Sequence, residues 1–267
     1  MYKLIAMDID DTLLNDRLEV TPGTREAIFA AMEMGVTVTL ATGRMYASAR
    51  NIAAQIGLNV PIITYQGALV KNSLDGKVWY ERYLPSEAAA KVYEYSVRRG
   101  LHLQVYWNDT LYAMEDNAKL REYAALSCVP YVIEDDLAKL LDKPFPKMIV
   151  IDEPAKLDEV AAELKSELGD EVHITKSKPH YLEFLHREGT KGDALRHLAA
   201  ELDCSLSQVI AIGDSWNDIE MIRTAGLGVA MGNAVPQLKE VADFVTLSNN
   251  EEGVRHVIEK FVLNSAR

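Results

Sequence analysis

The sequence predicts an α/β protein: a doubly wound, mostly parallel sheet into which a smaller α+β unit is inserted. Three observations lead to this prediction. Strand-like apolar runs alternate with helix-like segments near both ends of the chain, which is the pattern of a parallel sheet with helices on its faces. The middle third breaks that alternation. Four of the strand-like runs also end at clusters of polar residues.

The first part of the chain is expected to form strand, helix, strand, helix and strand. Thr21 and Pro22 are typical of a helix start, and Gly35 is typical of a helix end. The apolar runs have the lengths of buried strands. The elements expected here are strands over residues 4–7, 36–41 and 60–65, and helices over residues 22–34 and up to about residue 56.

The middle third carries hairpin signals such as Asp75-Gly76 between two strand-like runs. The expected strands cover residues 68–70, 77–82, 101–107, 110–114, 131–133, 147–151, 172–174 and 181–185. The expected helices cover the stretch from Pro85 to about residue 99 and residues 116–127, 135–141 and 155–168. We interpret residues 84–186 as a separate inserted α+β domain.

The alternation resumes after Gly189. The expected elements are helices over residues 191–202 and 251–263, strands over residues 208–212, 227–231 and 243–246, and a turn over residues 213–218 that leads into a further helix. Residues 1–83 and 187–267 together are therefore predicted to form one Rossmann-like core.

Composition narrows the class of protein. The 267 residues are 48% hydrophobic and 25% charged, which are ordinary globular values. No apolar run is long enough for a membrane span, and the N-terminus has no secretory pattern, so we expect a cytoplasmic protein. The net charge of −12 argues against a nucleic-acid partner. Cys128 and Cys204 have neither disulfide nor metal-ligand spacing. The sequence does not indicate an oligomeric state.

Asp8 and Asp10 follow the first strand directly. Side chains alternate along a strand, so these two carboxylates should project from one side, with Asp11 pointing elsewhere. Two like charges that close require a cation, or else perturbed pKa values. On this stretch alone, an acidic turn that caps the next element is an equally good interpretation.

Three other strand ends carry polar residues: Thr42-Gly43-Arg44, then Asp214 with Asn217 and Asp218, then Asn233. Ligands bind in the crevice outside the carboxyl ends of the strands in open α/β sheets. Taken singly, Thr42 and Asp214 could each be a helix N-cap. The coincidence of four polar strand ends favours a ligand site.

The residue types at these ends suit phosphoryl transfer with Mg²⁺. This cation prefers carboxylate oxygens, water and phosphate, and no His or Cys stands near the acids to favour zinc. A carboxylate can attack phosphorus to form an aspartyl-phosphate, and a second carboxyl can protonate the leaving oxygen. Lys191 is a candidate cation for the phosphoryl oxygens, although a lysine at a helix start is usually solvated.

Four motifs in order resemble the haloacid dehalogenase-like phosphatases. They are residues 8–14, residues 41–44, Lys191-Gly192 and residues 213–218. The late Lys-Gly and the large insertion resemble the features of one branch of this family, the Cof-type phosphatases with a type IIB cap. The resemblance covers essentially the whole chain.

The resemblance implies roles for individual residues. Asp8 would be the nucleophile and Asp10 the general acid/base. The phosphoryl group would be held by Thr42, Gly43, Lys191 and Asn217. Mg²⁺ would be bound by Asp8, Asp10 through its backbone carbonyl, Asp214 and Asp218. Arg44 and Glu183 are candidates for substrate contacts.

Two positions depart from the family pattern. Asp11 stands where many members have Gly, and Gln66 stands where Asn is usual. The expected function is a Mg²⁺-dependent phosphatase that hydrolyses phosphate monoesters of small metabolites, such as sugar phosphates or cofactor phosphates. A phosphotransferase or phosphomutase with the same intermediate, and a non-catalytic phospho-binding regulatory module, remain open alternatives.

Overall fold

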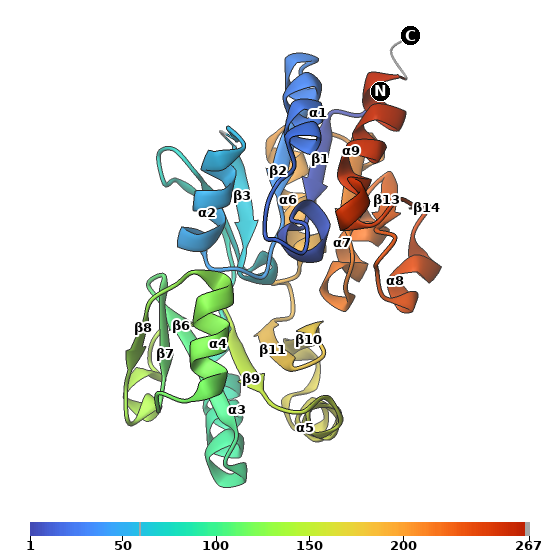
Figure 1. Cartoon of the computed structure of the whole chain (residues 1–267). Helices are drawn as coiled ribbons and strands as arrows, with labels where there is room; N and C mark the ends of the chain where they lie inside the picture. The colour runs from blue at the N-terminus through green and yellow to red at the C-terminus, as the bar shows by residue number, and fades with distance from the viewer. Residues whose placement is uncertain (59, 265–267) are drawn as a thin grey trace.

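A computed structural model describes residues 1–58 and 60–264 and divides into two lobes (Figure 1). The core lobe contains both chain ends of the described part, and the second lobe is formed by the middle of the chain. The mixed α/β class with a parallel core sheet, predicted from the sequence, is confirmed. The last three residues of the predicted core, 265–267, lie outside the described residues.

The core sheet is parallel throughout and has the strand order β14-β13-β12-β1-β2. Helices cover both faces of a parallel sheet, so its strands are apolar on both sides, and here β1 and β12 are fully buried. The five strands are β1 (Leu4–Met7), β2 (Thr37–Leu40), β12 (Val209–Gly213), β13 (Leu227–Ala230) and β14 (Phe244–Val245).

Six α-helices of the described core lobe surround this sheet. Helix α1 packs against α9, and α6 packs against α7. In Figure 1, α1 and α9 lie in front of the sheet and α6 lies behind it. The helices are α1 (Pro22–Glu33), α2 (Tyr46–Gln55), α6 (Lys191–Glu201), α7 (Ile219–Thr224), α8 (Pro236–Val241) and α9 (Gly253–Ile258).

The third predicted strand, β3 (Pro61–Thr64), extends the parallel sheet through a single bridge between Ala41 and Ile63. Its main partner is β4 (Leu69–Asn72), which pairs in turn with β5 (Val78–Glu81) in an antiparallel sheet. The hairpin expected around Asp75-Gly76 is therefore present, and it adds a small antiparallel sheet beside the core.

The second lobe is a six-stranded sheet of order β10-β11-β9-β6-β7-β8, antiparallel except for the β7–β8 pair. Its strands are β6 (His102–Trp107), β7 (Thr110–Ala113), β8 (Tyr131–Ile133), β9 (Met148–Ile151), β10 (Val172–Lys178) and β11 (Tyr181–His186). Its helices are α3 (Ser86–Arg99), α4 (Ala118–Ser127) and α5 (Pro154–Leu168).

The two faces of this sheet bury different cores. Leu103 and Val105 belong to an apolar cluster that is confined to the second lobe, whereas Tyr106 and Ile149 belong to a cluster that continues into the core lobe. Alternation along the strands separates the two sets. The sheet therefore contributes directly to the packing between the lobes.

Two predicted elements of the second lobe differ from the structure. The helix expected over residues 135–141 is a single 3₁₀ turn, Leu137–Leu140, because Asp136 caps it through Ala138 N–H and Pro144 follows closely. The strand expected over residues 172–174 is longer, because β10 pairs with β11 as far as Lys178. This extension brings the β10–β11 hairpin to the core lobe.

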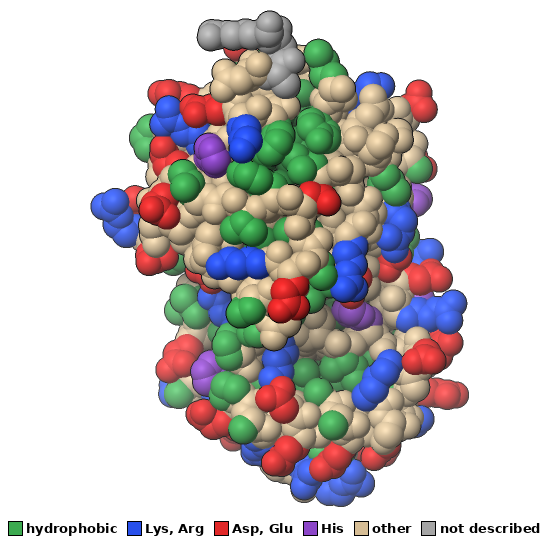
Figure 2. Space-filling view, turned by 90° about the vertical axis from the view of Figure 1, so that its right-hand side faces the viewer, with side chains coloured by type: hydrophobic (Ala, Val, Ile, Leu, Met, Phe, Trp, Pro, Cys, Tyr) green, Lys and Arg blue, Asp and Glu red, His purple; other side chains and the backbone are tan. Residues whose placement is uncertain are grey.

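The surface carries both signs of charge. On the face in Figure 2, acidic and basic side chains are interspersed, and none of the basic ones gather into a continuous patch there. Within residues 1–58 and 60–264, no helix combines the length and the apolar character that crossing a membrane requires.

Candidate functional site

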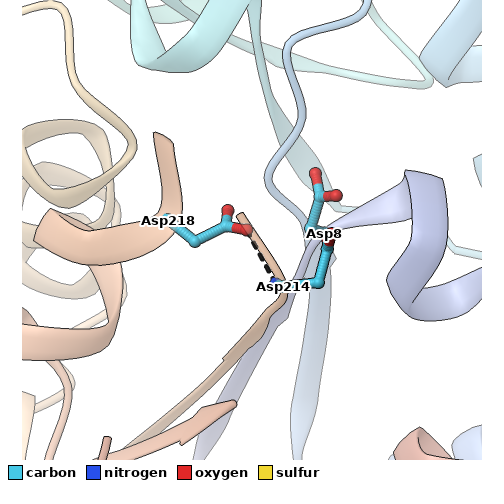
Figure 3. Close-up of side chains that lie close together, drawn as sticks. All are labelled: Asp8, Asp214 and Asp218. Atoms are coloured by element: carbon cyan, nitrogen blue, oxygen red, sulfur yellow. Dashed lines mark hydrogen bonds between the residues drawn. The ribbon is translucent and has the colours of Figure 1, made fainter. Parts of the chain in front are cut away.

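The carboxyl ends of the core strands bring three carboxylates together. Strand β1 lies between β2 and β12 with Met7 level with Leu40 and Ile212, so the residues that follow these strands are neighbours. Asp8, Asp214 and Asp218 each offer a carboxylate oxygen within 4.8 Å of those of the other two (Figure 3). Three of the polar residues that the sequence places after core strands therefore lie close together.

Asp8 is buried, with 6% of its surface exposed. Burial raises the pKa of Asp8 to about 7, although the ammonium of Lys191 lies 2.7 Å from its Oδ1 and opposes the rise. The nearby carboxylates of Asp218 and Asp10 also favour the protonated form. In the absence of a further cation, this site holds more negative charge than one lysine neutralises.

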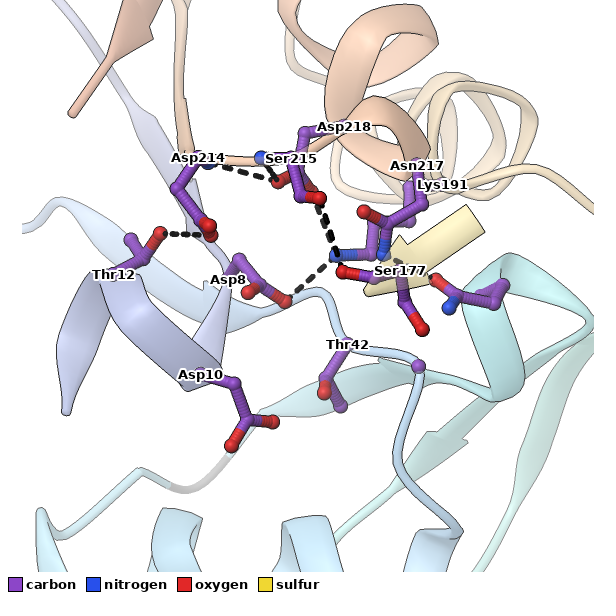
Figure 4. Close-up of polar contacts among 12 residues, drawn as sticks. Asp8, Asp10, Thr12, Thr42, Ser177, Lys191, Asp214, Ser215, Asn217 and Asp218 are labelled. Atoms are coloured by element: carbon purple, nitrogen blue, oxygen red, sulfur yellow. Dashed lines mark hydrogen bonds and ion pairs between the residues drawn. The ribbon is translucent and has the colours of Figure 1, made fainter. Parts of the chain in front are cut away.

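Lys191 begins α6 and is completely buried, unlike the usual lysine at a helix start. Its Nζ donates to Asp8 Oδ1 at 2.7 Å and to Asp218 Oδ1 at 2.6 Å (Figure 4). Burial would lower the pKa of Lys191, but these two carboxylates raise it above its usual value. The side chain is therefore a fixed positive charge beside Asp8.

Both carboxylate oxygens of Asp218 have protein partners. Oδ1 accepts from Lys191, and Oδ2 accepts the backbone N–H groups of Asp214 at 2.9 Å and Ser215 at 3.0 Å. Asp218 therefore orients the lysine and the loop that carries Asp214. This arrangement suits a supporting role better than direct ligation of a cation.

Asp214 faces Asp8 and is bound by one hydroxyl, because Thr12 Oγ1 donates to its Oδ1 at 3.0 Å. Burial, followed by the charges of Asp218 and Asp8, raises the pKa of Asp214 well above its usual value. Asp8 and Asp214 thus offer only oxygen ligands, and a nearby positive charge would favour their ionised forms. Both properties suit a hard divalent cation.

Neither Thr42 nor Asp214 is a helix N-cap, which was the alternative interpretation of both. The N-cap of α2 is Met45, and that of the turn over Trp216–Asp218 is Ser215. The Thr42 hydroxyl accepts from Arg44 N–H at 3.1 Å, and Figure 4 shows Thr42 close to Asp8. The buried hydroxyl can still donate to a bound group.

Asp10 lies beyond the end of β1, in an irregular turn over Ile9–Leu13 in which Asp11 has φ of 59°. That left-handed backbone favours Gly, which is the residue expected there from the family pattern. Both Asp10 oxygens accept from Arg44, at 2.9 Å from Nε and 2.7 Å from Nη2. The predicted substrate residue Arg44 thus holds Asp10 and also lines the cavity described next.

A cavity of about 90 Å³ lies over Asp8, between the two lobes. The core lobe contributes Asp8, Asp10, Asp214 and Asn217 to its lining. The second lobe contributes aromatic, cationic and acidic side chains: Tyr123, Lys147, Lys178, Tyr181 and Glu183. A substrate whose reacting group reaches Asp8 would therefore contact the second lobe.

Glu183, predicted as a substrate residue, lies in a buried polar cluster. Its Oε2 pairs with Lys147 Nζ at 2.8 Å, and its Oε1 accepts from Gln66 Nε2 at 2.7 Å. Lys147 also donates to the backbone carbonyl of Gly43 at 2.6 Å. On the outside, Asp11 pairs with Lys178 at 3.4 Å. Polar contacts therefore join the lobes on both sides of the cavity.

Sequence reasoning missed the contributions of Lys147, Tyr123 and Tyr181 to the cavity. They come from three separate elements of the middle third, where the sequence showed no motif. Lys147 offered one signal in the sequence, since it directly precedes the apolar run Met148–Ile151, and the structure buries its side chain. A lysine at the edge of an apolar run is rarely buried unless its charge is paired.

The start of α6 depends on Gly67. This residue has φ of +110°, and a Cβ there would lie 2.1 Å from the carbonyl oxygen of Thr190. We expect Gly67→Ala to lower the free energy of unfolding by at least about 3 kcal/mol, or to displace Lys191 and reduce activity. Urea unfolding followed by circular dichroism measures the first effect.

Gly35→Ala is the matched control. Gly35 also has a positive φ, of +83°, but nothing lies within 4 Å of its Cβ position. Gly35→Ala should lower the free energy of unfolding by only about 1 kcal/mol, because only the backbone conformation is disfavoured. Equal losses for the two variants would show that the approach of Gly67 to Thr190 is unimportant.

Comparisons with known proteins agree with this geometry. The family model described as haloacid dehalogenase-like hydrolase matches residues 5–258. YxeH of Bacillus subtilis is 36% identical over 270 residues, covering 98% of this chain and 99% of its own. The Bacillus subtilis 5-amino-6-(5-phospho-D-ribitylamino)uracil phosphatase YcsE is 32% identical over 269 residues, and the match covers 98% of this chain and 96% of YcsE. A crystal structure from Thermotoga maritima is 36% identical, has a TM-score of 0.83, and covers 98% of each chain.

Proposed function

The chain belongs to the haloacid dehalogenase-like hydrolase family, as its four motifs predicted, and on this premise we propose that it is a Mg²⁺-dependent phosphatase of small phosphorylated metabolites. The observation that carries the proposal is the placement of the Lys191 ammonium 2.7 Å from Asp8, within a group of three carboxylates. This is a site for an anionic group next to a nucleophile, and not only an acidic turn.

In the proposed reaction, Asp8 attacks phosphorus. Lys191 holds Oδ1 of Asp8, so Oδ2 is the attacking atom. A bond forms between Oδ2 and phosphorus, the bond from phosphorus to the leaving oxygen breaks, and Asp10 donates a proton to that oxygen. Water then attacks phosphorus and gives a proton to Asp10, which releases phosphate and restores the Asp8 carboxylate.

Arg44 controls the availability of Asp10. In the structure the guanidinium occupies both oxygens of Asp10 and holds this side chain at the edge of the cavity. Asp10 must free at least one oxygen to receive and deliver the proton. Asp10 is 32% exposed at its side chain, so it has room to move when a substrate enters.

The cation would be held by Asp8, Asp214 and the backbone carbonyl of Asp10, and Asp218 would support it through the loop that it orients. When bound, Mg²⁺ supplies positive charge for the phosphoryl oxygens. Thr42 and Gly43 would donate to the phosphoryl group. Lys191 would neutralise the remaining charge.

We propose that residues 84–186 act as a cap that selects the leaving group. The cavity is small, and Tyr123, Lys147 and Tyr181 of the second lobe line it together with the acids of the core. This composition supports small sugar phosphates or cofactor phosphates as substrates. We propose that the activity is cytoplasmic.

A panel of sugar phosphates, pyridoxal phosphate, flavin mononucleotide and nucleotides, assayed for phosphate release with Mg²⁺, tests the proposal. Release from at least one ester is expected. Transfer to an added sugar without equivalent free phosphate would instead indicate a phosphotransferase or phosphomutase. Tight ligand binding with no turnover of any ester would indicate a regulatory binding module.

Asp214→Asn should abolish the response of stability to Mg²⁺. For the wild type, Mg²⁺ at about 100 times its Kd should add about 2.7 kcal/mol of stability, and EDTA should remove it. The raised pKa of Asp214 predicts that the metal-free variant is more stable than the metal-free wild type at a pH above the usual range of a carboxyl pKa. Thermal unfolding with Mg²⁺ or EDTA measures both effects.

Asp11→Asn is the control for this prediction. Asp11 also lines the cavity, but it pairs with Lys178 and lies outside the three-carboxylate group. Asn tolerates the left-handed backbone at this position. The control should keep the full Mg²⁺ response. Equal Mg²⁺ responses in Asp214→Asn and the wild type would contradict the assignment of Asp214 as a ligand.

A further inference from the structure

Gln66 connects the second lobe to the candidate catalytic site. Its Nε2 donates to Glu183 Oε1 at 2.7 Å, and its Oε1 accepts from Asn217 Nδ2 at 2.8 Å. All three side chains are buried, with 2%, 1% and 7% exposed for Gln66, Glu183 and Asn217. Gln66 does not line the cavity, whereas Glu183 and Asn217, at the two ends of this hydrogen-bonded series, do.

The backbone at Gln66 indicates that this side chain is held in place at a cost. Its φ is +64°, a left-handed conformation that residues with a Cβ adopt rarely. Its amide also fills the space next to Gly43, where a Cβ would lie 2.3 Å from Gln66 Nε2. The phosphate-binding loop and the Gln66 amide are therefore fitted to each other.

Glu183 fixes the direction of the hydrogen bonds. Its carboxylate receives Lys147, Gln66 and the Ser177 hydroxyl, and an ionised carboxylate can only accept. Gln66 must therefore turn its NH₂ group to Glu183 and its oxygen to Asn217. Asn217 must in turn use its NH₂ group on Gln66.

As a result, the side-chain oxygen of Asn217 takes no part in this series of hydrogen bonds. Asn217 Oδ1 is buried and finds no hydrogen-bond donor among the described residues. An amide nitrogen carries two hydrogens, so Asn217 gives one to Gln66 and keeps the other as a donor. Asn217 lines the cavity and directly precedes Asp218, which holds Lys191, so its amide lies on the phosphate side of the site.

We propose that Gln66 is a positioning residue: the series Glu183, Gln66 and Asn217 holds the Asn217 amide so that its second N–H donates to the bound phosphate group. The proposal rests on the phosphatase function proposed above. Asn217 was expected to contact phosphate, and its hydrogen bond to Gln66 leaves one N–H for that contact. The departure from Asn at position 66 gives the side chain the length to bridge Glu183 and Asn217.

Gln66→Met keeps the length of the side chain and removes both hydrogen bonds. Kinetics with p-nitrophenyl phosphate and Mg²⁺, with inorganic phosphate as the competitive inhibitor, should show KM and the inhibition constant rising together by about tenfold. The value of kcat should change less, because the phosphate group is the part that substrate and inhibitor share. Gln104→Met, a buried glutamine of the second lobe bonded to Tyr106, should leave both constants unchanged.

A pair of exchanges tests the direction of the series. Gln66→Glu alone opposes two carboxylates and should weaken phosphate binding further. In the double variant Gln66→Glu with Glu183→Gln, the amide at position 183 donates to the carboxylate at position 66. That carboxylate also accepts from Asn217. Asn217 then keeps its orientation, so the double variant should recover phosphate binding to within about threefold of wild type.

Two results would overturn the proposal. One is an unchanged inhibition constant in Gln66→Met with a lowered melting temperature, which is the outcome of a purely structural bridge. The other is a double variant no better than Gln66→Glu alone. If the wild type releases no phosphate from any ester, the proposed function fails. In that case, calorimetry measures the affinity of each Gln66 variant for inorganic phosphate in the presence of Mg²⁺, and the same changes in affinity are expected without turnover.

Discussion

Asp8→Asn is expected to lower the turnover of phosphate monoesters by roughly 10⁴-fold or more, because the amide oxygen is a poor nucleophile for phosphorus. Lys191 can still donate to the amide oxygen at this position, so the variant should fold. The measurement is phosphate release with Mg²⁺ from the best ester of the panel. Turnover equal to that of the wild type would contradict the assignment of Asp8.

The same variant has a defined effect on stability. The pKa of Asp8 is raised from 3.8 to about 7, so the folded protein binds this proton more tightly than the unfolded chain. The stability from that proton is complete below pH 3.8 and is lost as the pH rises through 7. Metal-free Asp8→Asn should therefore be more stable than metal-free wild type at pH 8, with the difference vanishing near pH 4.

Lys191→Met is expected to have the second largest effect. It leaves Asp8 and Asp218 buried without the ammonium that contacts both of them. Breaking a buried ion pair by removing one partner typically costs about 3–5 kcal/mol, and here activity should fall as well, because the charge next to the phosphoryl group is lost. Urea unfolding and phosphate release measure the two losses separately.

Lys147→Met provides the comparison. Lys147 is also buried and pairs with Glu183 at 2.8 Å, but its hydrogen bonds go to Glu183 and to the carbonyl of Gly43 and do not reach Asp8. We expect a similar loss of stability and a smaller loss of kcat than for Lys191→Met. A Lys191→Met protein that is fully folded and retains wild-type kcat would rule out the proposed role of this lysine.

The sequence was sufficient to predict the neighbourhood of Asp8, Thr42 and Asp214. Each follows an apolar run that proved to be a parallel strand, and parallel strands in register bring their carboxyl ends together. Asp10 was harder to place from the sequence, because its expected direction depended on the strand continuing through it. The chain instead leaves β1 at Met7, and the turn directs Asp10 to Arg44.

Other features depended on tertiary packing that local patterns do not encode. The burial of Lys191 follows from the close approach of α6 to Gly67 and from two distant carboxylates. The pairing of Lys147 with Glu183 joins neighbouring strands of the second lobe, and nothing in the spacing of these residues indicates it. The boundaries of the inserted domain, 84–186, remain a prediction.

The central claim, that the phosphoryl group passes through Asp8, is tested most directly by trapping it with Asp10→Asn. A good leaving group such as p-nitrophenolate needs no proton, so this variant should still form the aspartyl-phosphate, but its hydrolysis should be slow for lack of a base. We expect a burst of p-nitrophenol and, after acid quenching and digestion, a phosphoryl group on the peptide that contains Asp8. Continued phosphate release with no burst and no modified Asp8 would contradict the account.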